Sequence, residues 1–367
     1  MINVYFDTPA VVIDYQKLLY NIQDMATYAA EHNFALRPHV KAHRLPQIAK
    51  LQIEHGATGF TCAKISEAAM LLAHQHNDFL LAHQLAGPIK MKKLNQLLEQ
   101  ADVIIGCDSV EGASLLQQLA TERAQTINIA LEVDSGLHRC GTQPGSETLE
   151  LAIAIRRQCP NLRIKGLFTH AGQAYAATSR EQLREIAKIE AHSVVDTAAL
   201  LTANGFSIDL ISVGSTPTAQ FSHLVPGVNE IRPGNYVFYD AIQVGLGVVP
   251  QERCALTVVA TVISRPAADR VVIDTGSKVL GLDKGAHGIS LVRGFGILLG
   301  WPHLSLERLS EEHGVIIKTA DGPLPEIGQQ IAIIPNHACP VLYRADLVHV
   351  TGLDEETVWP SAMRGSR

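Results

Sequence analysis

The sequence lacks several features that would assign a common class of protein. Its 30 Lys and Arg residues against 36 Asp and Glu residues give a net charge of −6, which leaves no overall basic field for a nucleic-acid backbone. No apolar run is long enough to span a bilayer, and residues 1–17 show no secretory signal. The six cysteines are scattered without a CxxC pair, which predicts reduced thiols in a cytoplasmic protein.

The sequence motifs of several enzyme classes are absent as well. HExxH, a P-loop, a complete GxGxxG and a GxSxG elbow do not occur. The composition is 47% hydrophobic and only 18% charged, so the chain can bury sizeable cores. Its 367 residues exceed the usual size of a single domain, which predicts one large domain and a smaller one.

The first two thirds of the chain alternate short apolar runs with amphipathic segments, a pattern typical of βα units. Eight candidate strands at a spacing of roughly thirty residues predict a (β/α)8 barrel of the TIM type. The candidate strands are residues 35–40, 59–62, 79–82, 103–106, 127–133, 164–169, 208–213 and 230–232. The helices expected between them are residues 46–55, 66–76, 89–100, 109–123, 148–158 and 180–204.

After Asp240 the sequence becomes rich in β-forming runs separated by Gly and Pro. These runs are residues 256–264, 270–274, 315–318, 330–334 and 345–350. We therefore expect an α/β barrel domain over residues 1–245 and a smaller β-rich domain over residues 246–367.

In a parallel α/β barrel the active site lies at the carboxyl ends of the strands, so the polar residues at those ends are the candidates. Lys41 follows the first strand. Desolvation there would lower the pKa of the lysine and free its amine for a Schiff base or for proton abstraction. A lysine that extends from a strand end to solvent is the plain alternative, so the neighbouring residues must decide.

Two glycine-containing loops follow the seventh and eighth strands. They are Gly214-Ser215-Thr216 and Gly234-Asn235-Tyr236, whose backbone N–H groups are unobstructed at the glycines. The loops after these two strands are where such barrels commonly bind phosphate. The same residues also favour ordinary tight turns, so each loop alone is a weak signal.

His337 and Cys339 form the third candidate group, two residues apart in the β-rich domain. On an extended segment both side chains would point to the same face. An imidazole nitrogen and a thiolate could then bind one cation, most simply Zn²⁺, although a packed cysteine beside a strand-end histidine is the alternative. Two protein ligands leave positions for water or substrate, as in a catalytic metal site.

Taken in order, these segments resemble the fold-type III pyridoxal-phosphate enzymes, and within them the D-threonine aldolase and D-serine dehydratase family. The N-terminal barrel of that family is similar to that of alanine racemase, and the resemblance covers nearly the whole chain. The matching segments are residues 8–14 (TPAVVID), 37–43 (RPHVKAH), 134–141 (DSGLHRCG), 230–236 (EIRPGNY), 310–314 (SEEHG) and 335–340 (PNHACP).

The resemblance implies a site for pyridoxal 5′-phosphate. Lys41 would hold the cofactor as a Schiff base, Arg139 would lie near its phenolic oxygen, and His170 would lie against its pyridine ring. Lys41 and His170 would be the catalytic residues. The further cofactor neighbours would be Gln173 and Tyr175, with Arg232 as partner of the ring nitrogen and Gly214, Ser215, Thr216, Gly234, Asn235 and Tyr236 around the phosphate.

The resemblance also implies a divalent metal at His337 and Cys339, with Zn²⁺ expected and Mn²⁺ or Mg²⁺ as alternatives. Family members with aldolase activity tend to have His and Asp there, so the cysteine favours a dehydratase. We therefore expect a lyase for D-β-hydroxy amino acids, of the D-serine dehydratase type, that releases a 2-oxo acid and ammonia. The alternatives are a D-threonine aldolase, an amino-acid racemase, a non-catalytic pyridoxal-phosphate protein, and a barrel enzyme without this cofactor. Related folds complete each site across two subunits, which implies a homodimer.

Overall fold

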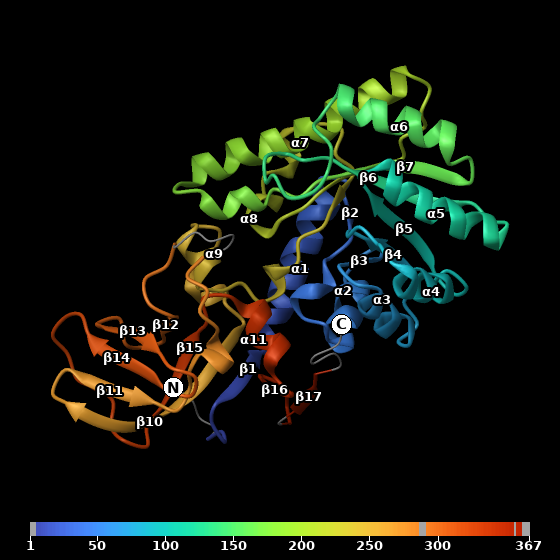
Figure 1. The fold of residues 1–367 in the computed structure, drawn as a ribbon. Coiled ribbons are helices and arrows are strands. Elements are labelled where there is room, and N and C mark those ends of the chain that lie inside the picture. The colour runs from blue at the N-terminus through green and yellow to red at the C-terminus, as the bar shows by residue number, and fades with distance from the viewer. Residues whose placement is uncertain (1–4, 286–290, 356, 362–367) are drawn as a thin grey trace.

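The computed structural model describes residues 5–285, 291–355 and 357–361. Two sheets form its core: an eight-stranded parallel sheet and a nine-stranded mixed sheet that lies beside it (Figure 1). The predicted architecture, an alanine racemase-like barrel followed by a smaller β domain, is thereby confirmed.

The parallel sheet has the strand order β2-β9-β8-β7-β6-β5-β4-β3. Isolated parallel bridges, Leu36 to Ala57 and His39 to Thr61, join the regions of its outer strands, so the sheet curls round on itself. All eight strands expected from the sequence are present. They are β2 (Ala35–Leu36), β3 (Phe60–Cys62), β4 (Asp78–Leu81), β5 (Asp102–Cys107), β6 (Ile127–Glu132), β7 (Leu162–Phe168), β8 (Leu210–Val213) and β9 (Glu230–Ile231).

The six expected helices cover the outer face of this sheet (Figure 1). They are α2 (Pro46–Glu54), α3 (Ile65–Leu72), α4 (Pro88–Leu97), α5 (Val110–Arg123), α6 (Ser146–Gln158) and α7 (Arg180–Ala203). Serine hydroxyls fix the start of two of them, because Ser109 accepts from the Gly112 amide and Ser179 from the Gln182 amide. Among the described residues no helix has the length and apolar character needed to cross a membrane.

The mixed sheet has the order β13-β14-β11-β10-β1-β16-β17, with β15 paired to β10 and β12 paired to β15. The five β runs expected after Asp240 are present as β10 (Leu256–Ala267), β11 (Arg270–Ile273), β14 (Gly314–Lys318), β15 (Gln330–Ile334) and β16 (Leu347–Thr351). Four strands were not predicted: β1 (Ala10–Asp14), β12 (Ile297–Leu298), β13 (Leu304–Leu309) and β17 (Thr357–Pro360).

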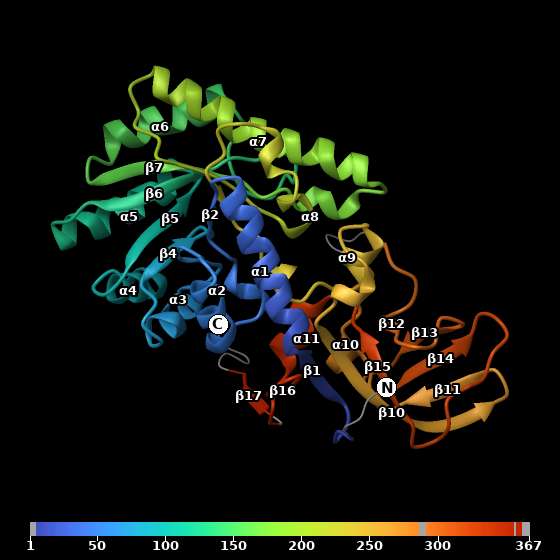
Figure 2. The ribbon, with the colours of Figure 1, turned by 180° about the vertical axis from the view of Figure 1, so that it is seen from behind.

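The first strand, β1, belongs to the sheet of the C-terminal domain. It pairs antiparallel with β10 and parallel with β16. Helix α1 (Tyr15–Glu31) then leads from β1 to the barrel strand β2, as the view from behind shows (Figure 2). The domain division after residue 245 stays a prediction, and β1 is an N-terminal contribution to the second sheet that the sequence did not reveal.

Gly166 in β7 allows a close approach of β7 to β8. A Cβ atom at this position would overlap the backbone carbonyl of Leu210 in β8. We expect Gly166→Ala to lower the free energy of unfolding by about 1–3 kcal/mol, measured by urea denaturation, because the two strands must separate. The control is Gly112→Ala in α5. There the atom nearest to an added Cβ is the Ser109 hydroxyl oxygen at 3.1 Å, and alanine favours the helix. An unchanged unfolding midpoint for Gly166→Ala would contradict this packing.

Candidate active site

A cavity of about 1130 Å³ lies at the carboxyl ends of the barrel strands and is closed on one side by the C-terminal domain. All of the site residues predicted from the sequence lie in its wall except Gln173 and Tyr236. The wall therefore contains Lys41, Arg139, His170, Tyr175, Gly214, Ser215, Thr216, Arg232, Gly234, Asn235, His337 and Cys339. The fold thus brings these residues together, while the role of each remains a prediction.

Lys41 lies in a single 3-10 turn, η1 (Val40–Ala42), directly after the first barrel strand. The imidazole of His39 accepts from the Lys41 amide and begins this turn. The Lys41 side chain is accessible from the cavity, but protein surrounds the cavity on most sides. This burial lowers the pKa of Lys41, and although Cys339 opposes the shift, the neighbouring Arg139 adds to it. The amine is therefore more readily available as a nucleophile or base than a surface lysine.

His170, at the end of β7, has a defined tautomer. Its Nδ1 atom lies 2.5 Å from the carbonyl oxygen of Gly214. Because a carbonyl oxygen only accepts hydrogen bonds, Nδ1 must carry the proton, and the Nε2 atom of the neutral ring is unprotonated. Burial, followed by the charge of Lys41, holds the pKa of His170 well below its usual value. The ring is therefore a neutral group with one lone pair.

Glu190 of α7 was not predicted from the sequence, yet it holds the loops after β7 and β8. Its Oε1 atom accepts from the amides of Ala171 and Gly214, each at 3.1 Å, and its Oε2 atom accepts from the Thr218 hydroxyl at 2.7 Å. Burial raises the pKa of this carboxyl. No sequence signal distinguishes Glu190 from the other acidic residues of a long amphipathic helix.

The two glycine loops are shaped by close contacts. A Cβ atom at Gly214 would lie 2.9 Å from the Cβ atom of Arg232, and one at Gly234 would lie 3.0 Å from the carbonyl oxygen of His39. Ser215 begins the short helix α8 (Thr216–Ala219), so the amide at Thr216 has no partner within that helix. The glycines therefore allow the backbone to line the cavity where side chains would obstruct it.

Gln173 and Tyr236 lie outside the cavity wall. The amide of Gln173 donates to the carbonyl oxygen of Ser135 at 2.7 Å. Tyr236 is fully buried, and its hydroxyl accepts from the Gln52 amide at 2.9 Å. The Tyr236 side chain therefore supports the loop from behind.

Arg139 projects into the cavity beside a buried acidic group. Its Nη2 atom lies 3.7 Å from Oε1 of Glu132, and the other carboxylate oxygen, Oε2, accepts from the side-chain amide of Gln84. Within the described ranges, one group of three potential metal ligands has all its atoms within 4.8 Å, namely Asp108, Glu132 and Cys140. Burial, and then Glu132 itself, raises the pKa of the Cys140 thiol. The group therefore places acidic side chains beside Arg139.

The backbone geometry predicted for His337 and Cys339 was wrong, because the segment is not a continuous strand. His337 is the extended residue that precedes α11 (Ala338–Arg344), and Cys339 lies in the first turn of that helix. The chain turns into the helix because the carboxylate of Asp240 accepts from the Ala338 amide at 3.0 Å. The two side chains nevertheless lie beside each other in the cavity wall.

The surroundings of this pair are acidic. Oδ2 of Asp283 lies 3.9 Å from Nδ1 of His337. Burial alone would lower the pKa of His337, but Cys339, and then Asp240 and Asp283, outweigh it and raise this pKa to about 9. The amide of Asn235 donates to Asp240 at 2.7 Å and lies 3.6 Å from the Cys339 sulfur. Such an environment favours a cation. Asp240 could have been found from the sequence as a polar residue that closes the last barrel segment.

A buried histidine next to the Lys41 turn makes the stability depend on pH. The Leu45 amide donates to Nδ1 of His43 at 3.1 Å, so Nε2 carries the proton and donates to Gln52 at 3.2 Å. Burial lowers the pKa of His43 from 6.5 to about 4. Between these two pH values the unfolded chain therefore binds more protons than the folded one.

We therefore expect the free energy of unfolding to fall as the pH is lowered from 6.5 to 4, by an amount on the order of 3 kcal/mol from His43. This contribution is fully present above pH 6.5. Denaturant titrations across this range should show a smaller pH dependence for His43→Gln than for the wild type. The same replacement at His192, which is exposed on α7, is the control. An equal slope for His43→Gln and the wild type would refute a neutral buried His43.

Comparison with known proteins gives the family. The alanine racemase N-terminal domain matches residues 13–241, and the serine dehydratase domain matches residues 255–351. D-threonine aldolase from Arthrobacter sp is 32% identical over 365 residues, which cover 98% of this chain and 93% of that protein. D-serine dehydratase from Dictyostelium discoideum is 29% identical, and the alignment covers 96% of this chain and 95% of that protein.

Solved structures agree with this result. D-threo-3-hydroxyaspartate dehydratase from Delftia sp. superimposes with a TM-score of 0.90 at 31% identity, over 97% of both chains. Alanine racemase from Clostridium difficile shares the fold, with a TM-score of 0.69 at 14% identity. The expected resemblance, and with it the expectation of a lyase, is confirmed at the level of the family. The chain belongs to the fold-type III pyridoxal-phosphate lyases of the D-threonine aldolase and D-serine dehydratase family.

Proposed function

We propose that the protein is a pyridoxal-phosphate- and metal-dependent lyase of the D-serine dehydratase type. One observation carries this proposal: the cavity joins a lysine of lowered pKa at a barrel strand end to a histidine and a cysteine from the other domain. A lysine alone would suit many reactions, and a His–Cys pair alone could be structural. Together in one cavity they suit the removal of a proton from Cα and of a hydroxyl group from Cβ of the same substrate.

The cavity suits pyridoxal phosphate. Lys41 would hold the cofactor, Arg139 would lie near its phenolic oxygen, and the neutral ring of His170 would pack against the pyridine ring. The phosphate would lie at the glycine loops, where the backbone approaches without side chains, and Arg232 would face the ring nitrogen. The cofactor supplies an electron sink for the negative charge that develops at Cα. Gln173, Tyr175 and Tyr236 would support these residues from the periphery.

The donor set at His337 and Cys339 suits Zn²⁺, because imidazole and thiolate are ligands that Zn²⁺ prefers. Mn²⁺ and Mg²⁺ stay as the alternatives, although both prefer oxygen ligands. The oxygen atom Oδ1 of Asn235 is buried nearby without a partner among the described residues, so it can accept from a water bound at the site. The Delftia dehydratase has been solved as a cysteine-to-alanine mutant in a metal-free form and as a histidine-to-alanine mutant. Those two residues are spaced like His337 and Cys339, which supports the same ligand pair here. A divalent cation there would supply Lewis acidity for the departing β-hydroxyl group.

The residues of the chain then divide the reaction between them. The amine of Lys41 takes the proton from Cα, because its lowered pKa leaves it unprotonated more often than a surface lysine. His170 stays neutral beside it, because burial and the charge of Lys41 hold its pKa well below the usual value, and the Gly214 carbonyl fixes the ring proton on Nδ1. The enclosing loops limit the access of water. The products would be a 2-oxo acid and ammonia.

We also propose that the protein is a homodimer in the cytoplasm. The family resemblance supports the dimer. The six cysteines support a reducing compartment, because all of them are free thiols.

The substrate and the outcome can be tested together. Metal-loaded holoenzyme incubated with D-serine, D-threonine or D-3-hydroxyaspartate should form a 2-oxo acid and ammonia, and L-serine should give no product. Release of glycine and an aldehyde would show an aldolase instead, as in the Arthrobacter relative. Exchange between D and L forms without product would show a racemase.

The metal role has its own prediction. We expect His337→Ala to lower the turnover of D-serine at least about 100-fold, because the β-hydroxyl loses its Lewis acid, while the absorbance of the bound cofactor stays unchanged. His192→Ala, at an exposed position on α7, is the matched control and should behave as the wild type. Full activity of the wild type after removal of divalent metals by a chelator would refute the metal role.

A further inference from the structure

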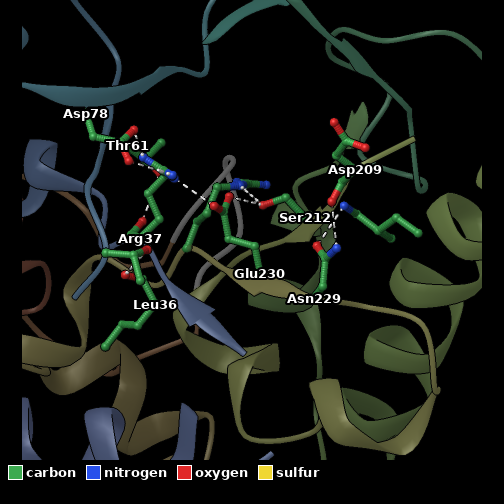
Figure 3. Close-up of polar contacts among 11 residues, drawn as sticks. Leu36, Arg37, Thr61, Asp78, Asp209, Ser212, Asn229 and Glu230 are labelled. Atoms are coloured by element: carbon green, nitrogen blue, oxygen red, sulfur yellow. Dashed lines mark hydrogen bonds and ion pairs between the residues drawn. The ribbon is translucent and has the colours of Figure 1, made fainter. Parts of the chain in front are cut away.

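A row of hydrogen-bonded polar side chains, all but one of them buried, runs through the interior of the barrel. Arg37, directly after β2, donates from Nε to Glu230 at 2.7 Å and from Nη1 to Asp78 at 2.6 Å. Figure 3 shows Arg37 between Asp78 of β4 and Glu230 of β9. The other carboxylate oxygen of Glu230 accepts from the hydroxyl of Ser212 in β8 at 2.7 Å. This row of side chains therefore links β4, β8 and β9 through Arg37.

Arg232 is the last member of this row and the one that reaches the cavity. Its Nε atom donates to the Ser212 hydroxyl oxygen at 2.8 Å, and its Nη2 atom donates to the carbonyl oxygen of Thr169. The single proton of the Ser212 hydroxyl is donated to Glu230, so the oxygen of Ser212 is left to accept from Arg232. The direction of every hydrogen bond between Arg37 and Arg232 is therefore determined.

Positive and negative side chains alternate along this row, which explains how the charges can be buried. Arg37, Glu230 and Arg232 are 8%, 2% and 5% exposed, whereas the side chain of Asp78 is 42% exposed at the far end. Burial lowers the pKa of Arg232, and Glu230 is the strongest of the acidic groups that counteract it. A buried guanidinium without such partners would be strongly destabilising. Glu230 therefore favours the charged form of Arg232, and Ser212 holds the guanidinium in place.

We propose that Ser212 and Glu230 are positioning residues for the reaction, because they fix the Arg232 guanidinium in the orientation in which it contacts the cofactor ring. This inference rests on the proposed binding of pyridoxal phosphate. The bonds to Ser212 and Thr169 use Nε and Nη2, so the rotation of the guanidinium is fixed and its Nη1 group keeps a constant direction. Without the Ser212 hydroxyl, Arg232 would keep its charge and its bond to Thr169. Its Nε atom would lose its partner, so the rotation of the guanidinium would no longer be fixed.

The first test uses Ser212→Ala and measures cofactor binding as well as activity. We expect the Kd of pyridoxal phosphate for the apoenzyme to rise about tenfold and kcat for D-serine to fall by a similar factor, as for a lost hydrogen bond to a charged group. The matched control is Ser193→Ala in α7, because Ser193 is also buried and its hydroxyl donates to the backbone carbonyl of Glu190 in its own helix. Equal melting temperatures of the two variants would show that the barrel is intact in both. A wild-type Kd in Ser212→Ala would overturn the proposal.

A double-mutant cycle separates positioning from a general effect on the barrel. If Ser212 acts through Arg232, Ser212→Ala should change the Kd of the cofactor far less in an Arg232→Lys background than in the wild type. Additive effects of the two substitutions would contradict this. Asp78→Asn should change the Kd in the same direction but less, since Asp78 acts only through Arg37 and Glu230.

A third measurement does not depend on the cofactor. In the apoenzyme, the Nε–H proton of Arg232 observed by NMR should exchange with water much faster in Ser212→Ala than in Ser193→Ala. Unchanged exchange would refute the positioning role even if the proposed function is correct. Faster exchange in a protein that binds no pyridoxal phosphate would instead refute the proposed function, while the hydrogen bond between Ser212 and Arg232 would stand.

Discussion

Parallel pairing of the eight barrel strands places all of their carboxyl ends at one mouth, and the loops that meet there must then be held in place. Buried carboxylates do this by accepting hydrogen bonds from loop amides. Glu67 accepts from Ala63 after β3, Glu190 accepts from the loops after β7 and β8, and Asp240 accepts from the chain at the start of α11. Each carboxylate replaces the water that a loop amide would otherwise bind, so the cavity keeps its shape where the backbone is irregular.

The second domain completes the cavity that the barrel begins. Strand β1 lies in its sheet, so the polypeptide passes from the second domain into the barrel after β1 and returns to the second domain after the barrel. These two passages tie the domains together. Helix α11 contacts the Lys41 turn, and the guanidinium of Arg44 lies 4.6 Å from the centre of the Tyr343 ring while it pairs with Glu67 at 2.8 Å. Packed and paired side chains therefore connect the Lys41 turn to the helix that carries Cys339.

Much of this arrangement could be predicted from the sequence, because strand periodicity and the polar residues at strand ends are local signals. The eight barrel strands follow from them, and the twelve predicted residues of the cavity wall follow from them together with the family resemblance. The pairing of β1 with β10 could not be predicted, since it joins residues far apart in the sequence. The same holds for Glu190, whose partners lie on two other loops. His337 and Cys339 were identified by their residue types, although the assumed extended backbone was wrong, because the hydrogen bond from Ala338 to Asp240 that starts the helix is also a long-range contact.

We propose that the cofactor binds to Lys41, in the cavity where the barrel meets the His–Cys pair. Borohydride reduction of the pyridoxal-phosphate-loaded protein, followed by mass spectrometry of its peptides, tests this assignment. We expect a single pyridoxyl-phosphate label, on Lys41. A label on another lysine, or no label after complete reduction of a yellow protein, would contradict it.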